Sequence, residues 1–145
     1  MNNSIDPRII KFVKKHHVLT LATSKEEQAW GCNCFYAFDD EKLEFYFLTE
    51  EATRHASEIL TNNKVAGSIV LESKLVGKLQ GVQFSGIAYR PKDDELSNAK
   101  AKYLKRFPYA IAANTPYWAI RVDIIKFTDN TLGFGKKLLW NRETI

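Results

Sequence analysis

The stretch FYFLTEEATRHASEIL, from Phe45 to Leu60, begins with the pattern of a β-strand and ends with that of an α-helix. At the junction the chain places Thr53, Arg54 and His55 side by side. A helix start has backbone N–H groups without partners and the positive end of the helix dipole, so it attracts anions. Polar residues are also common there because a helix start needs a cap. Two interpretations follow: an anion site, or a cap flanked by solvated side chains.

The composition is that of one folded domain, which we expect to span residues 1–145. Hydrophobic residues make up 45% of the chain and charged residues 26%, as in ordinary globular proteins. No apolar run reaches the roughly 20 residues that cross a bilayer, and the first residues lack the pattern of a secretion signal. These features predict a cytoplasmic protein without membrane contact. The net charge of +4 suits either nucleic acid or a small phosphate-bearing ligand.

The two cysteines, Cys32 and Cys34, lie in a segment with the pattern of a strand. Alternate residues of a strand share one face but are about 6.6–7 Å apart, at or beyond the limit for a disulfide. A metal site would need further ligands, and the only histidines are His16, His17 and His55, without a recognisable spacing. We therefore interpret the cysteines as small apolar side chains and predict no metal site.

Three segments carry the signals of helices. In residues 4–17, Asp6 can cap the helix and Pro7 fits its first turn. A second helix follows Thr53, and a third follows Pro91. In each of them apolar residues recur at helical spacing.

The remaining segments read as strands joined by short polar turns. The first three, VLTLAT, AWGCNCFYAFD and LEFYFLT, predict an antiparallel meander. The later strands are expected in VAGSIVL, LQGVQFSGIAYR, YWAIRVDIIKFTD and KKLLWN, and the glycines of LQGVQFSGIAYR suggest bulges or tight bends. We predict a mainly β fold of six to seven antiparallel strands with about three helices. Such strands tend to close on themselves, so we expect a small barrel, with an open α+β sandwich as the alternative.

The ordered set of these elements resembles the pyridoxamine 5'-phosphate oxidase-like FMN-binding split-barrel superfamily, whose barrel is of the Greek-key type. The segments that carry the resemblance are VLTLAT, CNCFYAFD, LEFYFLT, TRHASEILTNNKVAGSI, VQFSGIAYR and WAIRVDIIKFTD. The tail TDNTLGFGKKLLWNR is similar to that of the small bacterial YhbP-like branch. The resemblance covers nearly the whole chain, and its motifs are individually short.

The resemblance implies a homodimer with FMN in a groove between the two barrels. Its phosphate-binding segment corresponds to TEEATRHASEILTNN, where Thr53 and Arg54 match the hydroxyl and arginine of the family. His55 stands where many members have lysine. Arginine can bind a phosphate through two nitrogens, Thr49 or Thr53 can donate a hydroxyl, and a protonated His55 would add charge.

The resemblance also suggests contacts to the flavin ring. Asn33 and Cys34 fall where the family lines the groove, and Gln83 lies on a strand that faces the ring in similar proteins. For Gln83 the alternative is an outward-facing strand residue. Trp140 and Arg142 match a C-terminal segment that contacts the flavin of the partner; Trp140 could equally be a core anchor.

Three functions remain open at this stage. The leading hypothesis is a dimeric, FMN-dependent oxidoreductase of unknown substrate and electron donor, with catalytic residues unassigned. It is not a pyridoxamine phosphate oxidase, because the chain has no histidine after His55 and lacks that family's C-terminal arginine–histidine pattern. The second is a haem-binding or haem-degrading protein. The third is a non-enzymatic basic module for nucleic acid, whose bases would stack on strand aromatics, although such aromatics are more often core: Phe35, Tyr36, Phe45 and Tyr46.

Overall fold

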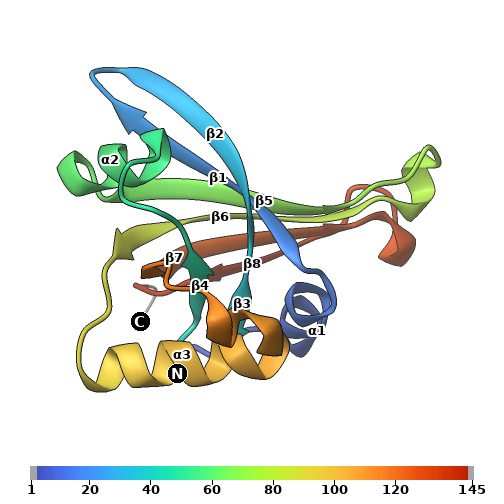
Figure 1. Ribbon diagram of the computed structural model, residues 1–145. Coiled ribbons are helices and arrows are strands. Elements are labelled where there is room, and N and C mark those ends of the chain that lie inside the picture. The colour runs from blue at the N-terminus through green and yellow to red at the C-terminus, as the bar shows by residue number, and fades with distance from the viewer. Residues whose placement is uncertain (1–2, 144–145) are drawn as a thin grey trace.

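The computed structural model of the chain describes residues 3–143, and within them it is mainly antiparallel β with three α-helices (Figure 1). The helices are α1 (Pro7–Lys15), α2 (Arg54–Thr61) and α3 (Asp94–Arg106). The strands are β1 (Val18–Lys25), β2 (Gln28–Phe35), β3 (Ala37–Asp39), β4 (Glu44–Leu48), β5 (Lys64–Leu71), β6 (Gln80–Tyr89), β7 (Tyr117–Asp129) and β8 (Lys137–Asn141). The predicted fold class is therefore confirmed.

All eight strands belong to one curled sheet with the order β2-β1-β5-β6-β7-β4-β3, and β8 pairs with β7. Every pairing is antiparallel. On its other side from β2, β1 pairs with β5, and on its other side from β3, β4 pairs with β7. The β1–β2 and β3–β4 hairpins thus lie at opposite ends of the strand order. The antiparallel pairings of the predicted meander, β1 with β2 and β3 with β4, are confirmed, but the pairings with β5 and β7 separate the two hairpins in the sheet.

The segment from residue 29 to residue 39, predicted as one strand, is divided at Tyr36. The Tyr36 N–H donates to the carbonyl of His17 at 3.0 Å, and its hydroxyl donates to the carbonyl of Val13 at 2.5 Å. These bonds turn the chain, so β2 pairs with β1 whereas β3 pairs with β4. A continuous stretch of chain therefore links the two ends of the sheet, which curls into a half-barrel (Figure 1).

Two glycines allow the strands to approach closely, and for one of them, Gly86, the sequence suggested a bulge or bend. A Cβ at Gly86 would lie 2.2 Å from the carbonyl oxygen of Arg121, and one at Gly67 would lie 2.5 Å from that of Thr20. The register between β6 and β7 shifts between Ser85 and Gly86. This bulge bends the long strands where the sheet curls.

The inner face of the sheet holds the main hydrophobic core, which α1 and α2 cover. The first helix begins as predicted, since the carboxylate of Asp6 accepts a hydrogen bond from the N–H of Arg8 at 2.9 Å. The helix contributes Ile9, Phe12 and Val13 to the core, and α2 contributes Ala56 and Ile59. Strand residues of this core include Leu19, Leu21, Ile69, Val82, Phe84 and Ile125.

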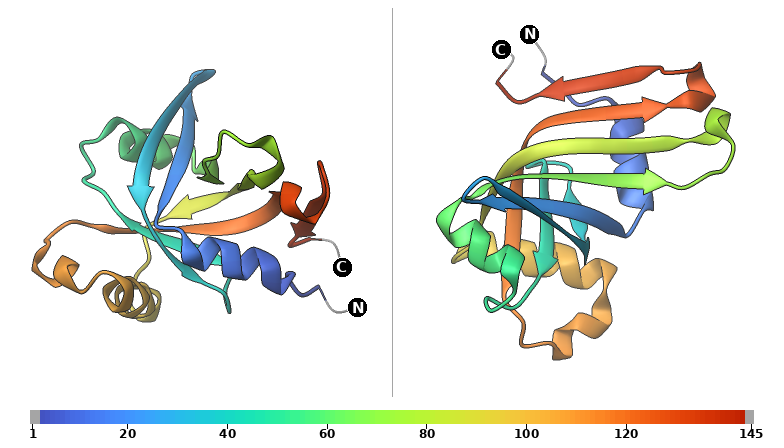
Figure 2. Two further views of the ribbon diagram at one scale, coloured as in Figure 1. Left: turned by 90° about the vertical axis from the view of Figure 1, so that its right-hand side faces the viewer. Right: turned by 90° about the horizontal axis from the view of Figure 1, so that it is seen from above.

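The third helix packs on the other side of the sheet, against β3, β4 and the first half of β7 (Figure 1). Its Ala99 and Tyr103 form a second cluster with Tyr46, Tyr117 and Ala119. Viewed from above, β5, β6, β7 and β8 lie side by side, and the loops at their far ends meet (Figure 2). Among residues 3–143, no helix has the length and apolar character needed to cross a membrane.

Candidate functional site at the start of helix α2

The junction between β4 and α2 brings two hydroxyls and an imidazole together. The hydroxyl of Thr49 lies 2.7 Å from Nε2 of His55 and 3.3 Å from the hydroxyl of Thr53. Thr53 is the N-cap of α2: its Oγ1 accepts from the N–H of Ala56 at 3.3 Å and donates to the carbonyl of Glu50 at 2.8 Å. The structure thus places three predicted site residues, Thr49, Thr53 and His55, in one cluster.

The guanidinium of Arg54 does not simply face water. Its Nε donates to the carboxylate of Glu58 at 3.3 Å, one helical turn away, and its centre lies 4.1 Å from the ring centroid of Trp30 on β2. The Glu58 side chain is almost fully buried and also accepts from the hydroxyl of Thr23 at 3.4 Å. Trp30 and Glu58 therefore fix the position of the Arg54 side chain, which is 47% exposed.

The start of α2 also has hydrogen-bond donors that lack an acceptor among the described residues. Within residues 3–143, the backbone N–H groups of Arg54 and His55 have no acceptor, and neither do the two terminal nitrogens of the Arg54 guanidinium. Unpaired N–H groups at a helix start and a positioned guanidinium are the donors that bind phosphate in proteins. The residues present therefore fit a phosphate group, although the carboxylates of Glu58 and Glu26, which line the adjoining cavity, oppose its charge.

Burial changes the expected role of His55. Removal from solvent lowers the pKa of His55, and the nearby Glu58 carboxylate offsets this only in part. The imidazole is then neutral at neutral pH and acts as a hydrogen-bonding group beside Thr49 rather than as a positive charge. From the sequence we expected His55 to add positive charge to the site when protonated.

Acidification is expected to destabilise the protein through His16 and His55. Burial also lowers the pKa of His16, with smaller contributions from Lys15, His17 and Arg106. Since the unfolded chain takes up these protons first, the free energy of unfolding falls as the pH drops below about 6.5. Urea unfolding at about pH 7 and about pH 5 measures this change.

The double variant His16→Leu/His55→Gln is the control for that prediction. It should lose most of the difference between the two pH values, because the folded and unfolded chains then no longer differ in imidazole protonation at these sites. An equal fall of the unfolding free energy in the wild type and the variant would assign the effect to other groups.

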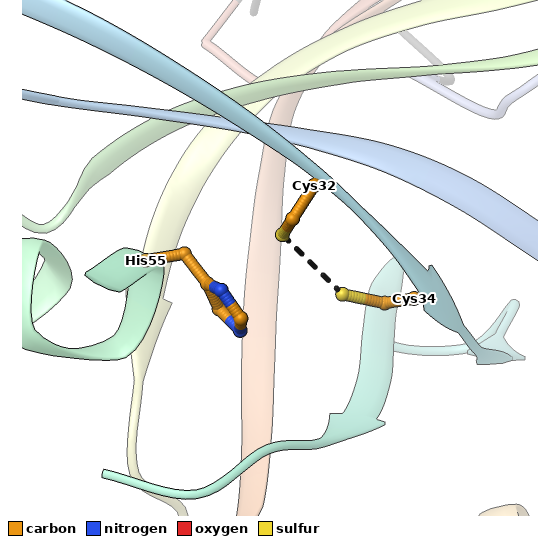
Figure 3. A group of neighbouring side chains, drawn as sticks. All are labelled: Cys32, Cys34 and His55. Atoms are coloured by element: carbon orange, nitrogen blue, oxygen red, sulfur yellow. Dashed lines mark hydrogen bonds between the residues drawn. The ribbon is translucent and has the colours of Figure 1, made fainter. Parts of the chain in front are cut away.

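The two cysteines face the inner side of β2, next to His55 (Figure 3). Cys34 is buried and Cys32 is half-buried, and both are free thiols. Their Sγ atoms lie 3.8 Å apart. The description of small apolar side chains suits Cys34 better than Cys32. No sequence spacing indicated that His55 would join them, because the packing of α2 on β2 brings them together.

Asn33 and Gln83 lie on the opposite, outer face of the sheet. Register pairs connect Asn33 to Thr20, Thr20 to Ser68, and Ser68 to Gln83, so these side chains form one row across β2, β1, β5 and β6. Asn33 and Gln83 are exposed, and Thr20 donates to the side-chain oxygen of Asn33 at 3.0 Å. Asn33 and Cys34, predicted to line the same groove, thus point to opposite faces.

The C-terminal residues Trp140 and Arg142 make their contacts within their own barrel. Trp140 is buried in the main core, and its indole N–H donates to the carbonyl of Asn3 at 3.0 Å. Arg142 donates from Nε to the carbonyl of Val122 at 2.7 Å and lies over the Trp140 ring. Trp140 is therefore a core anchor, which was the alternative to a flavin contact. Both side chains make their contacts within their own chain, whereas a contact with a partner's flavin requires them to point outward.

The strand aromatics that suggested base stacking are mostly internal. Tyr36, Phe45 and Tyr46 are at most 1% exposed, whereas Phe35 is 54% exposed. Buried rings cannot stack on nucleotide bases, so the alternation of aromatic residues along these strands indicates packing in the core.

Two cavities bear on ligand binding. One of about 250 Å³ adjoins the start of α2 and is lined by Lys25, Glu26, Gln28, Arg54, Ser57 and Glu58. A larger one, of about 460 Å³, lies on the other side of the molecule between α3 and the segment before β7, where Arg90, Lys100 and Tyr117 line it. The smaller cavity is the one that contains the predicted phosphate-binding arginine.

Sequence reasoning missed Trp30, Glu58 and Lys25 as parts of this region. The spacing of Arg54 and Glu58, four residues apart on a helix, is a signal that could have predicted their pairing. The contact of Trp30 with Arg54 joins residues far apart in the chain and has no local signal.

Comparison with known proteins gives relatives that match over most of this chain. A UPF0306 protein of Photorhabdus laumondii is 41% identical over 143 residues, covering 98% of this chain and 100% of the relative. UPF0306 protein YhbP of Escherichia fergusonii is 46% identical over 136 residues, covering 94% and 92%. No protein-family model matches the sequence.

Solved structures of low sequence identity share the fold. A haem-binding protein from Mycobacterium smegmatis has a TM-score of 0.72 at 22% identity, covering 86% of this chain and 52% of that one. HutZ, the haem storage protein of Vibrio cholerae, has a TM-score of 0.68 at 18% identity, covering 83% and 91%. A FAD-binding protein from Mesorhizobium loti has a TM-score of 0.65 at 15% identity, covering 82% and 88%. The chain thus shares the fold of these solved structures, and it belongs to the UPF0306 family, which includes YhbP.

Proposed function

We propose that this split-barrel protein binds FMN with the phosphate at the start of α2 and acts as a flavin-dependent oxidoreductase. The observation that carries the proposal is the set of unpaired donors there: two backbone N–H groups and the terminal nitrogens of Arg54, beside the hydroxyls of Thr49 and Thr53. Phosphate ionised at neutral pH is the group that such a helix start and guanidinium bind best. A FAD-binding protein with the same fold supports a flavin as the ligand.

The roles of the residues follow from their contacts. Arg54 is held by Glu58 and Trp30 so that its terminal nitrogens remain available, which lowers the entropy lost on binding phosphate. The hydroxyl of Thr49 donates to a phosphate oxygen and is oriented by the Nε2–H of neutral His55, while the hydroxyl of Thr53 caps α2 and donates to the carbonyl of Glu50. A bound flavin supplies the redox chemistry, and the protein supplies binding and orientation.

We further propose that the protein works as a homodimer formed through the outer face of the sheet. Within residues 3–143, no helix packs on the outer side of β1, β2 and β5. Apolar side chains of the outer face are exposed to solvent, including Val70 on β5 at 61% and Leu139 on β8 at 72%. Exposed apolar patches of this kind mark interaction surfaces. The face also carries Asn33 and Gln83, so a second barrel placed on it would make them groove residues, as the family resemblance implies.

The substitution Val70→Lys is expected to shift the protein from dimer to monomer. An unpaired ammonium buried between two sheets costs several kcal/mol. Sedimentation velocity at about 10 µM should resolve the two states. Leu75→Lys, at a similarly exposed residue in the loop after β5, is the matched control and should leave the dimer intact. A dimeric Val70→Lys variant would exclude this face as the interface.

Flavin retention tests the proposed cofactor. The purified protein, incubated with FMN and passed over a desalting column, should retain the flavin at micromolar protein concentration. The same experiment with riboflavin, which lacks the phosphate, should give weaker retention by at least about tenfold, because the phosphate contacts are lost. Equal retention of the two compounds, or of neither, would remove the proposal.

Haem is the second candidate, because two proteins of the same fold bind or store it. His55 is the histidine at the proposed site, whereas His16 packs against Phe12 and His17 is exposed beside Phe107. Haem iron coordinated by His55 would give a sharp Soret band that His55→Ala abolishes and His17→Ala leaves unchanged. Haem binding without FMN binding would favour this candidate.

A further inference from the structure

The inner face of β2 and the start of α2 bring two thiols and one imidazole into a single cluster. One ligand atom each from Cys32, Cys34 and His55 lie within 4.8 Å of one another (Figure 3). All three side chains are at least partly buried, and the chain has no other cysteines. The imidazole of His55 also contacts Thr49 and Thr53 at the start of α2, whereas the two thiols have no role in the proposed phosphate site.

The separation of the two sulfur atoms matches that of two thiolates on one zinc ion. In a tetrahedral site with Zn–S bonds of about 2.3 Å, the two sulfurs lie about 3.8 Å apart. Cys32 Sγ and Cys34 Sγ are 3.8 Å apart. A thiolate sulfur and an imidazole nitrogen on the same ion lie about 3.6 Å apart. Since the ligand atoms lie within 4.8 Å of one another, closing the site needs a shift of at most roughly 1.2 Å by the His55 side chain.

The fold holds these ligands in place without a metal. Cys32 and Cys34 pair with Leu21 and Leu19 of β1, so both thiols sit on a rigid hairpin strand. The ring of His55 is fixed by its hydrogen bond with Thr49. Ligands that are positioned beforehand lose little conformational freedom on binding.

The donor set selects the type of metal. Thiolates favour soft or borderline ions. The two negative charges of two thiolates, with a neutral imidazole, balance the charge of Zn²⁺ in a half-buried site. Three protein ligands leave the fourth position to water, which is the arrangement of catalytic rather than closed structural zinc sites. Ca²⁺ and Mg²⁺ prefer oxygen ligands, which this cluster does not offer.

We propose that Cys32, Cys34 and His55 form a zinc site with an open fourth position. The proposal goes beyond the FMN function and does not depend on it. Binding forms two Zn–S bonds and one Zn–N bond, and each thiol that is protonated beforehand releases its proton to solvent.

Metal titration of flavin-free protein tests the proposal. The wild type should bind one Zn²⁺ per chain with a Kd below about 1 µM in competition with a chromophoric chelator. Co²⁺ in place of Zn²⁺ should give the intense visible bands of a tetrahedral ion and a thiolate-to-metal charge-transfer band. Absence of saturable binding, or a cobalt spectrum without the thiolate band, would overturn the proposal.

Variants distinguish this site from adventitious metal binding. Cys32→Ser, Cys34→Ser and His55→Gln should each weaken zinc binding by more than about 100-fold, since loss of a ligand exceeds the effect of losing an outer-shell partner. His17→Gln removes an exposed imidazole elsewhere and should bind zinc as the wild type does. Unchanged affinity in both cysteine variants would contradict the assignment.

A measurement on the wild type alone guards against variants that fail to fold. Bound Zn²⁺ should slow alkylation of both cysteines by at least about tenfold, and a chelator should restore the original rate. Alkylation at the same rate with and without zinc would show that the thiols are not ligands. Because flavin is absent throughout, failure of the zinc proposal leaves the FMN proposal standing, and the reverse also holds.

Discussion

Replacing Arg54 by alanine is expected to weaken FMN binding by about 10- to 100-fold. The variant removes the contact of the Arg54 guanidinium with the phosphate, and the expected loss corresponds to the net contribution of one charged hydrogen bond, about 1.5–3 kcal/mol. Fluorescence titration of FMN with the wild-type and variant proteins measures the change. Riboflavin affinity should stay the same in both proteins, because that ligand has no phosphate.

Arg54 also pairs with the buried Glu58, so the single variant needs a control for folding. The double variant Arg54→Ala/Glu58→Gln removes both charges, so it should recover stability without recovering FMN affinity. Arg8→Ala removes a guanidinium that pairs with Asp6 at the start of α1, away from the site, and should bind FMN normally. If Arg54→Ala bound FMN as tightly as Arg8→Ala, the phosphate would not be at α2.

The substitution Gly86→Ala is expected to lower the free energy of unfolding by about 3 kcal/mol or more. A Cβ at this residue would lie 2.2 Å from the carbonyl oxygen of Arg121 and 3.0 Å from its carbonyl carbon. Both atoms are backbone, so relief would require β6 and β7 to separate at the bulge. Urea denaturation followed by circular dichroism gives the change.

Gly77→Ala is the matched control, since a Cβ there meets no atom within 4 Å. Its effect should stay within about 0.5 kcal/mol, the range typical of exposed substitutions. A Gly86→Ala protein as stable as Gly77→Ala would mean that the two strands do not approach as closely as described.

Much of the fold could be predicted because its signals are local. The Asp6–Pro7 start of α1, the Thr53 cap of α2 and the bounds of β7 follow from residue type and periodicity. The division at Tyr36 could not be predicted, because hydrogen bonds to Val13 and His17 decide it. The pairing of β4 with β7 likewise depends on contacts between distant parts of the chain.

The candidate site could be predicted only where its residues are neighbours in sequence. Thr53, Arg54 and His55 share one helix start, so their proximity follows from the chain. Trp30 joins Arg54, and Cys32 joins His55, only because α2 packs on the β1–β2 hairpin. Strand alternation alone predicts that Asn33 and Cys34 point to opposite faces, whereas the family resemblance placed both in one groove.

A crystal structure of the protein with FMN tests the central claim most directly. The account predicts phosphate oxygens within hydrogen-bond distance of the backbone N–H groups of Arg54 and His55 and of the terminal nitrogens of the Arg54 side chain. Density for the phosphate at any other place, with the start of α2 contacting only solvent, would contradict it.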